Sequence, residues 1–548
     1  AALRLGAYAE HGLTDHFLDG DLAGPTVYAA ALPLEEIALR HQQRARSILH
    51  PAGLWAHWPL DEERGAVVHD RGPAQAHGEL VNRGTWMIGG PSYEGEVPRF
   101  STYDPTTDAL RGHGLRLASD DLYDCRWRAV HAVRIPAEAP PGYYVARFEH
   151  ELDGVACEQH VTFVVRRGPR EPAPPLLVLA ATNTWRAYGA TPFAQGHHEP
   201  APVWLPEGRP DQPEPEPSPR LPAFGLYRPH AAGQGTYAVG LRVPNPAAGP
   251  CVRLAASPDY AHLARADLYT TAWLERRGHD FDLVTDLDLH REPDRLGRHR
   301  VLVIGGHAEY WSDAMYEGVA RFLAAGGRLL CLSGNAIFWR VSIDLDELVI
   351  ECRKVDCAGA QVPAHRRGEA WHSLDGRRGG LMRECDRPAA RLTGLDTLGA
   401  IDPQPGRFGP YVVEEGCDHP LLRAAGLAPG DSLGEAPRDH PASVAGGHEA
   451  DVSLATLRRI QVEPDPPGAS APEPPRGLTI LARGHHWDVR ATIADYFLRE
   501  IDPPELLGAE IVHWERPEGG QVFSVGAVSA GWSLYHDPKL ARLVDVVL

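Results

Sequence analysis

Several features that are common in proteins are rare or missing in this chain of 548 residues. Lys354 and Lys539 are the only lysines among 54 basic residues, a bias typical of a GC-rich genome. Acidic residues outnumber basic ones and the formal net charge is -19. That balance argues against nucleic-acid binding, which needs a basic surface, and more weakly against an anionic membrane surface.

No stretch approaches the roughly 20 consecutive apolar residues that a membrane-spanning helix needs, and no signal-peptide pattern is visible. The eight cysteines include no CxxC pair, and the nearest two, Cys352 and Cys357, are separated by four residues. This spacing predicts reduced thiols and a cytoplasmic protein. Because the chain opens on Ala1 without an initiator methionine, we expect that a preceding segment is missing. Whether that segment contained a signal sequence stays open.

The pattern along the chain predicts a multidomain protein. Residues 1–50 alternate apolar and polar residues before a helical stretch, which is typical of the end of a larger β-domain. Residues 51–170 carry short alternating runs, such as WRAVHAVRI and GYYVARFEHEL, between turn residues, and favour a β-sandwich. Residues 171–548 change to longer apolar runs and predict an α/β domain with proline-rich insertions and a β-rich end.

Strands and helices alternate in the first part of that third region. We predict strands at 176–182, 281–286, 300–306 and 328–334, with helices at 260–278 and 312–327. This order is typical of a doubly wound parallel sheet, in which ligands bind beyond the carboxyl ends of the strands. Three loops should therefore meet at that edge: 182–189, 306–311 and 333–340.

The stretch GGHAEYWSDAM, residues 305–315, has an unusual density of reactive side chains at this edge. His307, Glu309 and Tyr310 could each bind a metal or transfer a proton. Tyr269 on the preceding predicted helix could face the same crevice. Phenolate and carboxylate oxygens suit a highly charged cation such as Fe(III), although buried tyrosines are more often packed and hydrogen-bonded to protein.

Other chemistries have weaker signals. Ser333 and Cys331 end a predicted strand where a nucleophile could sit, but the G-x-S-x-G pattern is absent. The 28 histidines include no HExxH or similar spacing. Neither pattern singles out a catalytic residue.

One long stretch resembles a known family. Residues 301–344, VLVIGGHAEYWSDAMYEGVARFLAAGGRLLCLSGNAIFWRVSID, together with LLVLAATNTWRAYG (176–189) and GEAWHSLDGRRGGL (368–381), are similar to the large, or beta, subunit of N,N-dimethylformamidase. The resemblance covers most of residues 17–400. It implies that residues 1–50 close a laminin-G-like module and that residues 171–548 form a glutamine-amidotransferase-like catalytic domain.

The resemblance also implies a mononuclear iron held by two tyrosines and one glutamate. Carried onto this sequence, Tyr310 and Tyr269 are the expected tyrosines and Glu369 is the expected carboxylate. Glu384 is the alternative carboxylate, because Arg377 and Arg378 stand where relatives often have an acidic residue.

The expected activity is hydrolysis of a small N-substituted amide, such as N,N-dimethylformamide, by water activated at Fe(III). His372, His307 or Glu309 would transfer protons and Asn335 would orient the carbonyl or oxyanion. A small alpha subunit and an α2β2 or higher assembly are expected partners. Two alternatives stay open: a carbohydrate- or protein-binding protein with a degenerate amidotransferase-like domain, and a hydrolase that uses a cysteine or serine.

Overall fold

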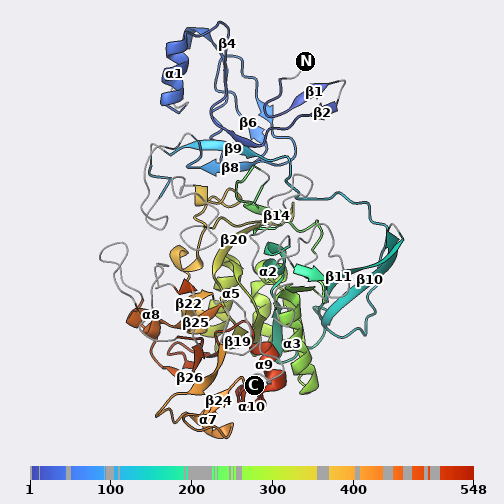
Figure 1. Cartoon of the computed structure of the whole chain (residues 1–548), viewed down its shortest axis with the longest axis vertical. Helices are drawn as coiled ribbons and strands as arrows, with labels where there is room; N and C mark the ends of the chain where they lie inside the picture. The colour runs from blue at the N-terminus through green and yellow to red at the C-terminus, as the bar shows by residue number, and fades with distance from the viewer. Residues whose placement is uncertain are drawn as a thin grey trace. The chain divides into compact units, whose positions relative to one another are not determined.

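The computed structural model describes most of the chain (Figure 1). The described residues are 3–10, 13–44, 51–91, 93, 104–108, 111–152, 154–189, 193–195, 225–227, 229–230, 232–245, 248–250, 252–254, 262–354, 369–400, 408–435, 449–460, 472–486, 492–493 and 507–548. The adjacent histidines at 197–198 and most of the two proline-rich stretches lie outside them.

The chain divides into two compact units. Unit 1 comprises residues 1–126, 216–243 and 341–381, and unit 2 comprises residues 127–215, 244–340 and 382–548. Each unit is therefore built from separate stretches of sequence.

Unit 1 is rich in short antiparallel strands. The strands β3 (Gly20–Leu22), β9 (His113–Leu117) and β8 (Thr85–Ile88) form one small sheet. Three further pairs are β1 (Tyr8–Glu10) with β2 (Leu13–Asp15), β4 (Thr26–Tyr28) with β5 (Leu54–His57), and β6 (Val67–Val68) with β7 (Gly78–Glu79). The strand β21 (Val349–Glu351) pairs with both β14 (Ala238–Gly240) and β20 (Trp339–Asp344). The helix α1 spans Leu34–Gln42. Many small sheets agree with the predicted β-rich character, while the laminin-G-like assignment stays a prediction.

The centre of unit 2 is a sheet of nine strands in the order β16-β12-β17-β19-β29-β28-β26-β23-β24. The first five are parallel: β16 (Phe281–Thr285), β12 (Leu176–Ala180), β17 (Val301–Gly306), β19 (Arg328–Ser333) and β29 (Gln521–Ser524). The other four continue antiparallel: β28 (Glu510–Glu515), β26 (Leu478–His486), β23 (Phe408–Val413) and β24 (Ser432–Leu433). The four parallel strands expected from the sequence are confirmed. From β12 the chain adds β16 on one side and then β17 on the other, so the strand order reverses between β12 and β17. Ligands are expected beside that pair.

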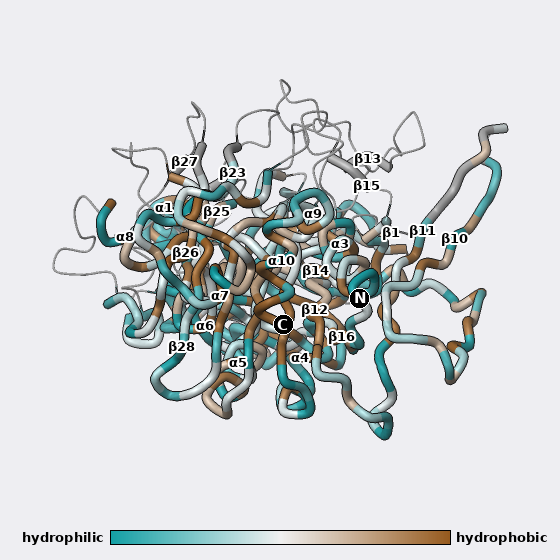
Figure 2. The backbone as a smooth tube through the Cα atoms, turned by 90° about the horizontal axis from the view of Figure 1, so that it is seen from below, coloured by the Kyte–Doolittle hydropathy of each residue, from teal (hydrophilic) through white to brown (hydrophobic). Residues whose placement is uncertain are grey.

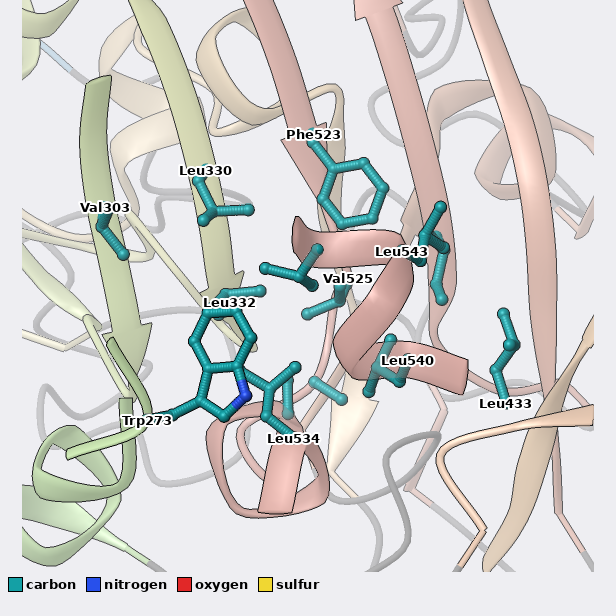
Figure 3. Close-up of a cluster of buried hydrophobic side chains, with 14 of the residues drawn as sticks. Trp273, Val303, Leu330, Leu332, Leu433, Phe523, Val525, Leu534, Leu540 and Leu543 are labelled. Carbon is teal, nitrogen blue, oxygen red and sulfur yellow. The ribbon is translucent and has the colours of Figure 1, made fainter. Parts of the chain in front are cut away.

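Helices cover both faces of this sheet, as continuous apolar strands require. One face carries Val303, Leu330 and Leu332 against Trp273 of α3 (Leu263–Arg276) and Leu534 of α9 (Ala530–His536) (Figure 3). The opposite face packs alternate residues of the same strands, such as Leu302 and Leu329, against Val319 of α5 (Asp313–Ala324). In Figure 2, hydrophobic brown colouring runs along β12 and around β26, which agrees with buried strands.

The rest of unit 2 surrounds this sheet. The strands β22 (Leu395–Ala400), β25 (Ala450–Ser453) and β27 (Thr492–Ile493) form a second sheet. Two further antiparallel pairs are β10 (Gly142–Leu152) with β11 (Val155–Val165), and β13 (Phe193–Gln195) with β15 (Val252–Leu254). The remaining elements are β18 (Tyr310–Ser312), α2 (Thr182–Ala187), α4 (Asp286–Arg291), α6 (Ala390–Thr393), α7 (Pro420–Ala424), α8 (Leu454–Ile460) and α10 (Pro538–Val547).

Local signals explain where α5 begins. Its N-cap is Ser312, and the hydroxyl of Ser312 accepts a hydrogen bond from Met315 N. At the other end the chain turns at Gly326, which has a φ of 92° that favours glycine. The helix therefore starts directly after the stretch 305–311 and fixes its exit direction.

Three local expectations are wrong. Residues 182–187 form the helix α2 rather than a loop, and residues 530–536 form α9 within the end of the chain that was predicted to be β-rich. The stretch 127–135 forms no strand, and its Val130 is 91% exposed. Alternating valines stabilise a strand only when a neighbouring strand packs beside them. Separately, every helix in the described part of the chain is too short or too polar to cross a membrane.

Candidate active site at the carboxyl edge of the sheet

The candidate site in unit 2 is centred on His307, which directly follows β17 and has a fully buried side chain. Gly306 makes this position possible. Its φ is 60°, and a Cβ atom there would lie 2.2 Å from Asp267 Oδ1. Any larger residue would have to displace α3 or the His307 backbone.

The imidazole of His307 contacts several polar side chains, among them one histidine and two glutamates. Its Nδ1 lies 2.7 Å from His262 Nε2, and its Nε2 lies 2.8 Å from Glu449 Oε2 and 3.5 Å from Glu309 Oε2. His262 is the N-cap residue of α3, and Glu449 directly precedes β25. Residues far apart in the sequence therefore meet at one buried imidazole.

This surrounding charge controls the protonation of His307. Burial acts to lower its pKa, but the carboxylates of Glu449 and Glu309 outweigh burial and raise the pKa of His307 to about 9. The two carboxylates therefore favour the protonated form of His307. The carboxylates of Glu449 and Glu309 thus place negative charge around the His307 ring.

Hydrogen bonds fix the backbone of Glu309 on both sides. Its N–H donates to Thr184 Oγ1 at 3.0 Å, and its carbonyl oxygen accepts hydrogen bonds from the backbone N–H groups of Phe338 and Trp339, each at 2.9 Å. The side chain is 2% exposed. Helix α2 and the loop after β19 thus fix the backbone from which this carboxylate projects.

Asn335 belongs to the loop after β19 and has a left-handed φ of 47°. Its backbone N–H donates to Asp451 Oδ1 at 2.9 Å, and its side-chain Oδ1 accepts a hydrogen bond from Thr397 Oγ1 at 3.0 Å. Its Nδ2 lies 3.5 Å from His307 Nε2. The amide nitrogen of Asn335 therefore faces the same space as His307.

Tyr188 follows α2 and completes the group. Its ring centroid lies 5.0 Å from that of His262 and 5.8 Å from that of His307. The short helix α2 is fixed by buried carboxylates: Asp286 Oδ2 accepts Asn183 N–H at 2.6 Å, and Asp267 Oδ2 accepts Trp185 Nε1–H at 3.0 Å. Burial raises the pKa of Asp286 to about 7 and that of Asp267 well above its usual range.

This chemistry suits a cation. Among the described residues, His262, His307 and Glu449 offer one ligand atom each, all within 4.8 Å of one another. The Glu309 carboxylate and the Tyr188 phenol lie beside them. Carboxylate, phenolate and imidazole donors together fit iron.

The structure brings together three of the four predicted catalytic residues, namely His307, Glu309 and Asn335. The fourth, His372, belongs to unit 1, where its Nδ1 lies 2.9 Å from Ser342 Oγ and its side chain is buried. Each of these roles stays a prediction.

Each of the three predicted iron ligands has a different local environment. Tyr310 is buried next to Glu309, and its carbonyl oxygen accepts Asn183 Nδ2–H at 3.2 Å. Tyr269 packs against Trp532 and Tyr535 of α9. In unit 1, Glu369 Oε2 accepts hydrogen bonds from Tyr237 OH at 3.0 Å and from Arg116 Nη2 at 3.3 Å. The alternative Glu384 lies in the 3-10 turn Met382–Cys385 of unit 2 and is half-buried.

Sequence reasoning missed His262, Glu449 and Tyr188. Tyr188 lies in the stretch 182–189 that was assigned to the sheet edge, so its position was a usable signal. His262 and Glu449 have no spacing that links them to His307, and only the fold brings them together.

The proposed nucleophile positions are buried structural groups. Cys331 packs in the core, and burial raises the pKa of its thiol to about 12. Ser333 Oγ accepts the backbone N–H of Ala308 at 3.2 Å. Trp185 and Trp311 also pack in hydrophobic clusters.

Comparison with known proteins supplies independent information. A family model described as "N,N-dimethylformamidase beta subunit-like, C-terminal" matches residues 93–540. The N,N-dimethylformamidase beta subunit of Paracoccus aminophilus is 26% identical over 570 residues, covering 97% of this chain and 68% of the relative. A protein with the same description from Alcaligenes sp is 24% identical over 575 residues, with the same coverage of each chain.

Proposed function

The chain belongs to the N,N-dimethylformamidase beta subunit-like family, and from this we propose that it is a hydrolase that cleaves the C–N bond of a small N-substituted amide. The observation that supports the site most strongly is the buried cluster of His307, Glu449, Glu309 and Asn335 at the point where the strand order of the sheet reverses. The curated relatives are named for an enzyme that acts on N,N-dimethylformamide, which makes formamides the first substrates to test.

We further propose that the site holds one Fe(III), as the family resemblance implies. Glu309 supports this assignment because it offers a buried carboxylate on a fixed backbone, and the ring of Tyr188 lies beside His307. Tyr310 and Tyr269 remain proposals for the second tyrosine, and Glu369 is the competing carboxylate. When bound, Fe(III) supplies Lewis acidity, which polarises an amide carbonyl and lowers the pKa of water.

The protein groups can carry out the remaining steps. Hydrolysis adds a water oxygen to the carbonyl carbon, breaks the C–N bond and delivers a proton to the departing amine. The Glu449 carboxylate, hydrogen-bonded to His307 Nε2, is placed to take a proton from water, and the protonated His307 is placed to deliver one to the amine nitrogen. Asn335 Nδ2 is a donor on the same side and can stabilise the negative charge that develops on the carbonyl oxygen.

The name "beta subunit" carried by the relatives also supports a partner. We propose that the chain binds a small alpha subunit in an α2β2 or higher assembly in the cytoplasm. Size measurement of the assembly purified from its native host, with mass spectrometry of each band, tests this point.

The function is tested by incubating the purified, iron-loaded assembly with a series of formamides and acetamides. Release of amine and acid in equal amounts, together with about one iron per chain and visible ferric-phenolate absorption, is the expected result. A protein without metal, colour or turnover would instead favour the carbohydrate- or protein-binding alternative. Turnover without metal would favour a serine hydrolase, because the buried Cys331 thiol has a pKa of about 12.

A further inference from the structure

Asn335 can donate to a substrate only if its amide has the correct orientation. A side-chain amide has an acceptor oxygen on one branch and a donor NH2 group on the other, and a rotation of 180° exchanges them. The reversed orientation would present the oxygen to the site, where it would repel the negative charge that forms on the carbonyl oxygen.

Thr397 contacts the oxygen branch of the Asn335 amide and, as the donor of this hydrogen bond, favours the orientation in which that branch is the oxygen. Its Oγ1 donates to Asn335 Oδ1 at 3.0 Å, on the side of the amide opposite to the contact between Nδ2 and His307. Thr397 is 7% exposed, and Asn335 is 5% exposed, so water does not easily replace this hydroxyl. With the oxygen held by Thr397, the NH2 group points toward His307 and the reaction space.

The pairing of β22 with β25 holds Thr397 in a fixed position relative to Asn335. Thr397 lies in β22 and is the direct cross-strand partner of Asp451 in β25. Asp451 accepts the backbone N–H groups of Asn335 at 2.9 Å and of Ala336 at 3.4 Å. The second sheet of unit 2 therefore holds both the backbone and the side chain of Asn335.

The loop that carries Asn335 is tightly packed, which limits the backbone conformations that it can adopt. A Cβ atom on Gly334 would lie 2.3 Å from Glu449 O and 2.7 Å from Val528 N, so this loop is in close backbone contact with its surroundings. Asn335 and Ile337 both have left-handed φ values, 47° and 59°. Such backbone strain persists only where neighbouring contacts hold it.

We propose that Thr397 is a positioning residue that sets the orientation of the Asn335 amide, a role that rests on the proposed function of Asn335 as a donor. Thr397 acts through Asn335 and does not itself touch the substrate. It thereby decides whether the site presents a hydrogen-bond donor or an acceptor to the amide carbonyl.

The test is a double-mutant cycle on the iron-loaded assembly. Thr397→Val keeps the shape of the side chain but removes the donor, so we expect kcat to fall at least about tenfold, with KM and iron content little changed. Thr397→Ser keeps the hydroxyl and should restore most of the activity. In an Asn335→Ala background, Thr397→Val should have no further effect on kcat.

The outcomes separate this proposal from the proposed function. An equal loss from Thr397→Val in both backgrounds, or no loss in the native background, would overturn the positioning role while leaving Asn335 as a donor. Full activity of Asn335→Ala would instead overturn the use of Asn335 itself. Melting temperatures of all variants identify any that lose activity only because they unfold.

Discussion

The Nε2 atom of His307 lies 2.8 Å from Glu449 Oε2, inside a cluster where the imidazole is fully buried. These two residues are separated by more than one hundred positions in the sequence and are joined by the fold of unit 2. A carboxylate so close to a buried imidazole orients the ring and stabilises its protonated form. The pair is therefore suited to the proton transfers of amide hydrolysis.

Glu449→Gln should reduce turnover by about two to four orders of magnitude, because the acid–base pair loses its charged partner. Because Glu449 also belongs to the group of residues that offers ligand atoms, its proposed role in proton transfer predicts a loss of turnover that greatly exceeds any loss of iron. The measurement is kcat/KM with parallel metal analysis, and Glu435→Gln, at an exposed glutamate, is the matched control. Unchanged kcat/KM in Glu449→Gln would exclude the pair from the chemistry.

Gly306→Ala should damage both the site and the fold. The new Cβ would meet Asp267 Oδ1 and would also impose a side chain on a φ of 60°. We expect a loss of stability of about 1–3 kcal/mol from the backbone conformation alone, and a larger loss of activity because His307 is the next residue. The control is Gly278→Ala, which has a φ of 75° and nothing within 4 Å of its Cβ, so it measures the backbone cost without the clash.

Cys331→Ala should keep native turnover. The thiol is buried in the core and its pKa is raised to about 12, so almost none is ionised at neutral pH. Only stability should change, by roughly 1 kcal/mol, because a small buried group is removed. Loss of all activity in a variant that still folds and still binds iron would revive the cysteine-hydrolase alternative.

Glu351 in unit 1 should stabilise the protein above acidic pH. Burial opposes its ionisation, but Arg353, His372 and the N–H groups of Ser373 and Leu374 lower the pKa of Glu351 to about 2. Since the folded pKa is below the usual value, the stabilisation is complete above about pH 4.5 and is lost as the pH falls toward 2. The shift corresponds to about 3 kcal/mol near neutral pH.

Glu351→Gln should therefore lower the free energy of unfolding at pH 7 and reduce its dependence on pH between 4.5 and 2. Denaturant unfolding at several pH values measures both effects. The exposed neighbour Glu347→Gln serves as the control and should change stability little, because surface ion pairs contribute little. A Glu351→Gln variant with the same acid-dependent slope as the native protein would contradict the assignment.

The parallel strands and α3 and α5 were predictable because they are long and strongly patterned. Val301–Gly306 and Arg328–Ser333 are continuous apolar strands that end in polar loops, and Ser312 is a strong N-cap signal for the helix between them. The helix α2 was missed because Asp286 and Asp267 stabilise its start through tertiary hydrogen bonds that the sequence does not reveal.

The site was partly predictable for the same reason. His307, Glu309 and Asn335 lie directly beyond predicted strands, where the sheet order places ligands. His262 is the N-cap of α3, Glu449 directly precedes β25 and Thr397 lies in β22, so their convergence depends on packing across unit 2. Sequence patterns report local structure, so contacts of this kind require the fold.

The central claim is that amide hydrolysis takes place at the His307 cluster with Glu309 as the carboxylate that holds iron. The most direct measurement is amine release from N,N-dimethylformamide, with iron content, for the native assembly and for Glu309→Gln, with Glu317→Gln on the exposed side of α5 as the control. The account predicts that the native protein and the control contain iron and turn over, while Glu309→Gln loses iron and activity together. Native iron content and turnover in Glu309→Gln would contradict it.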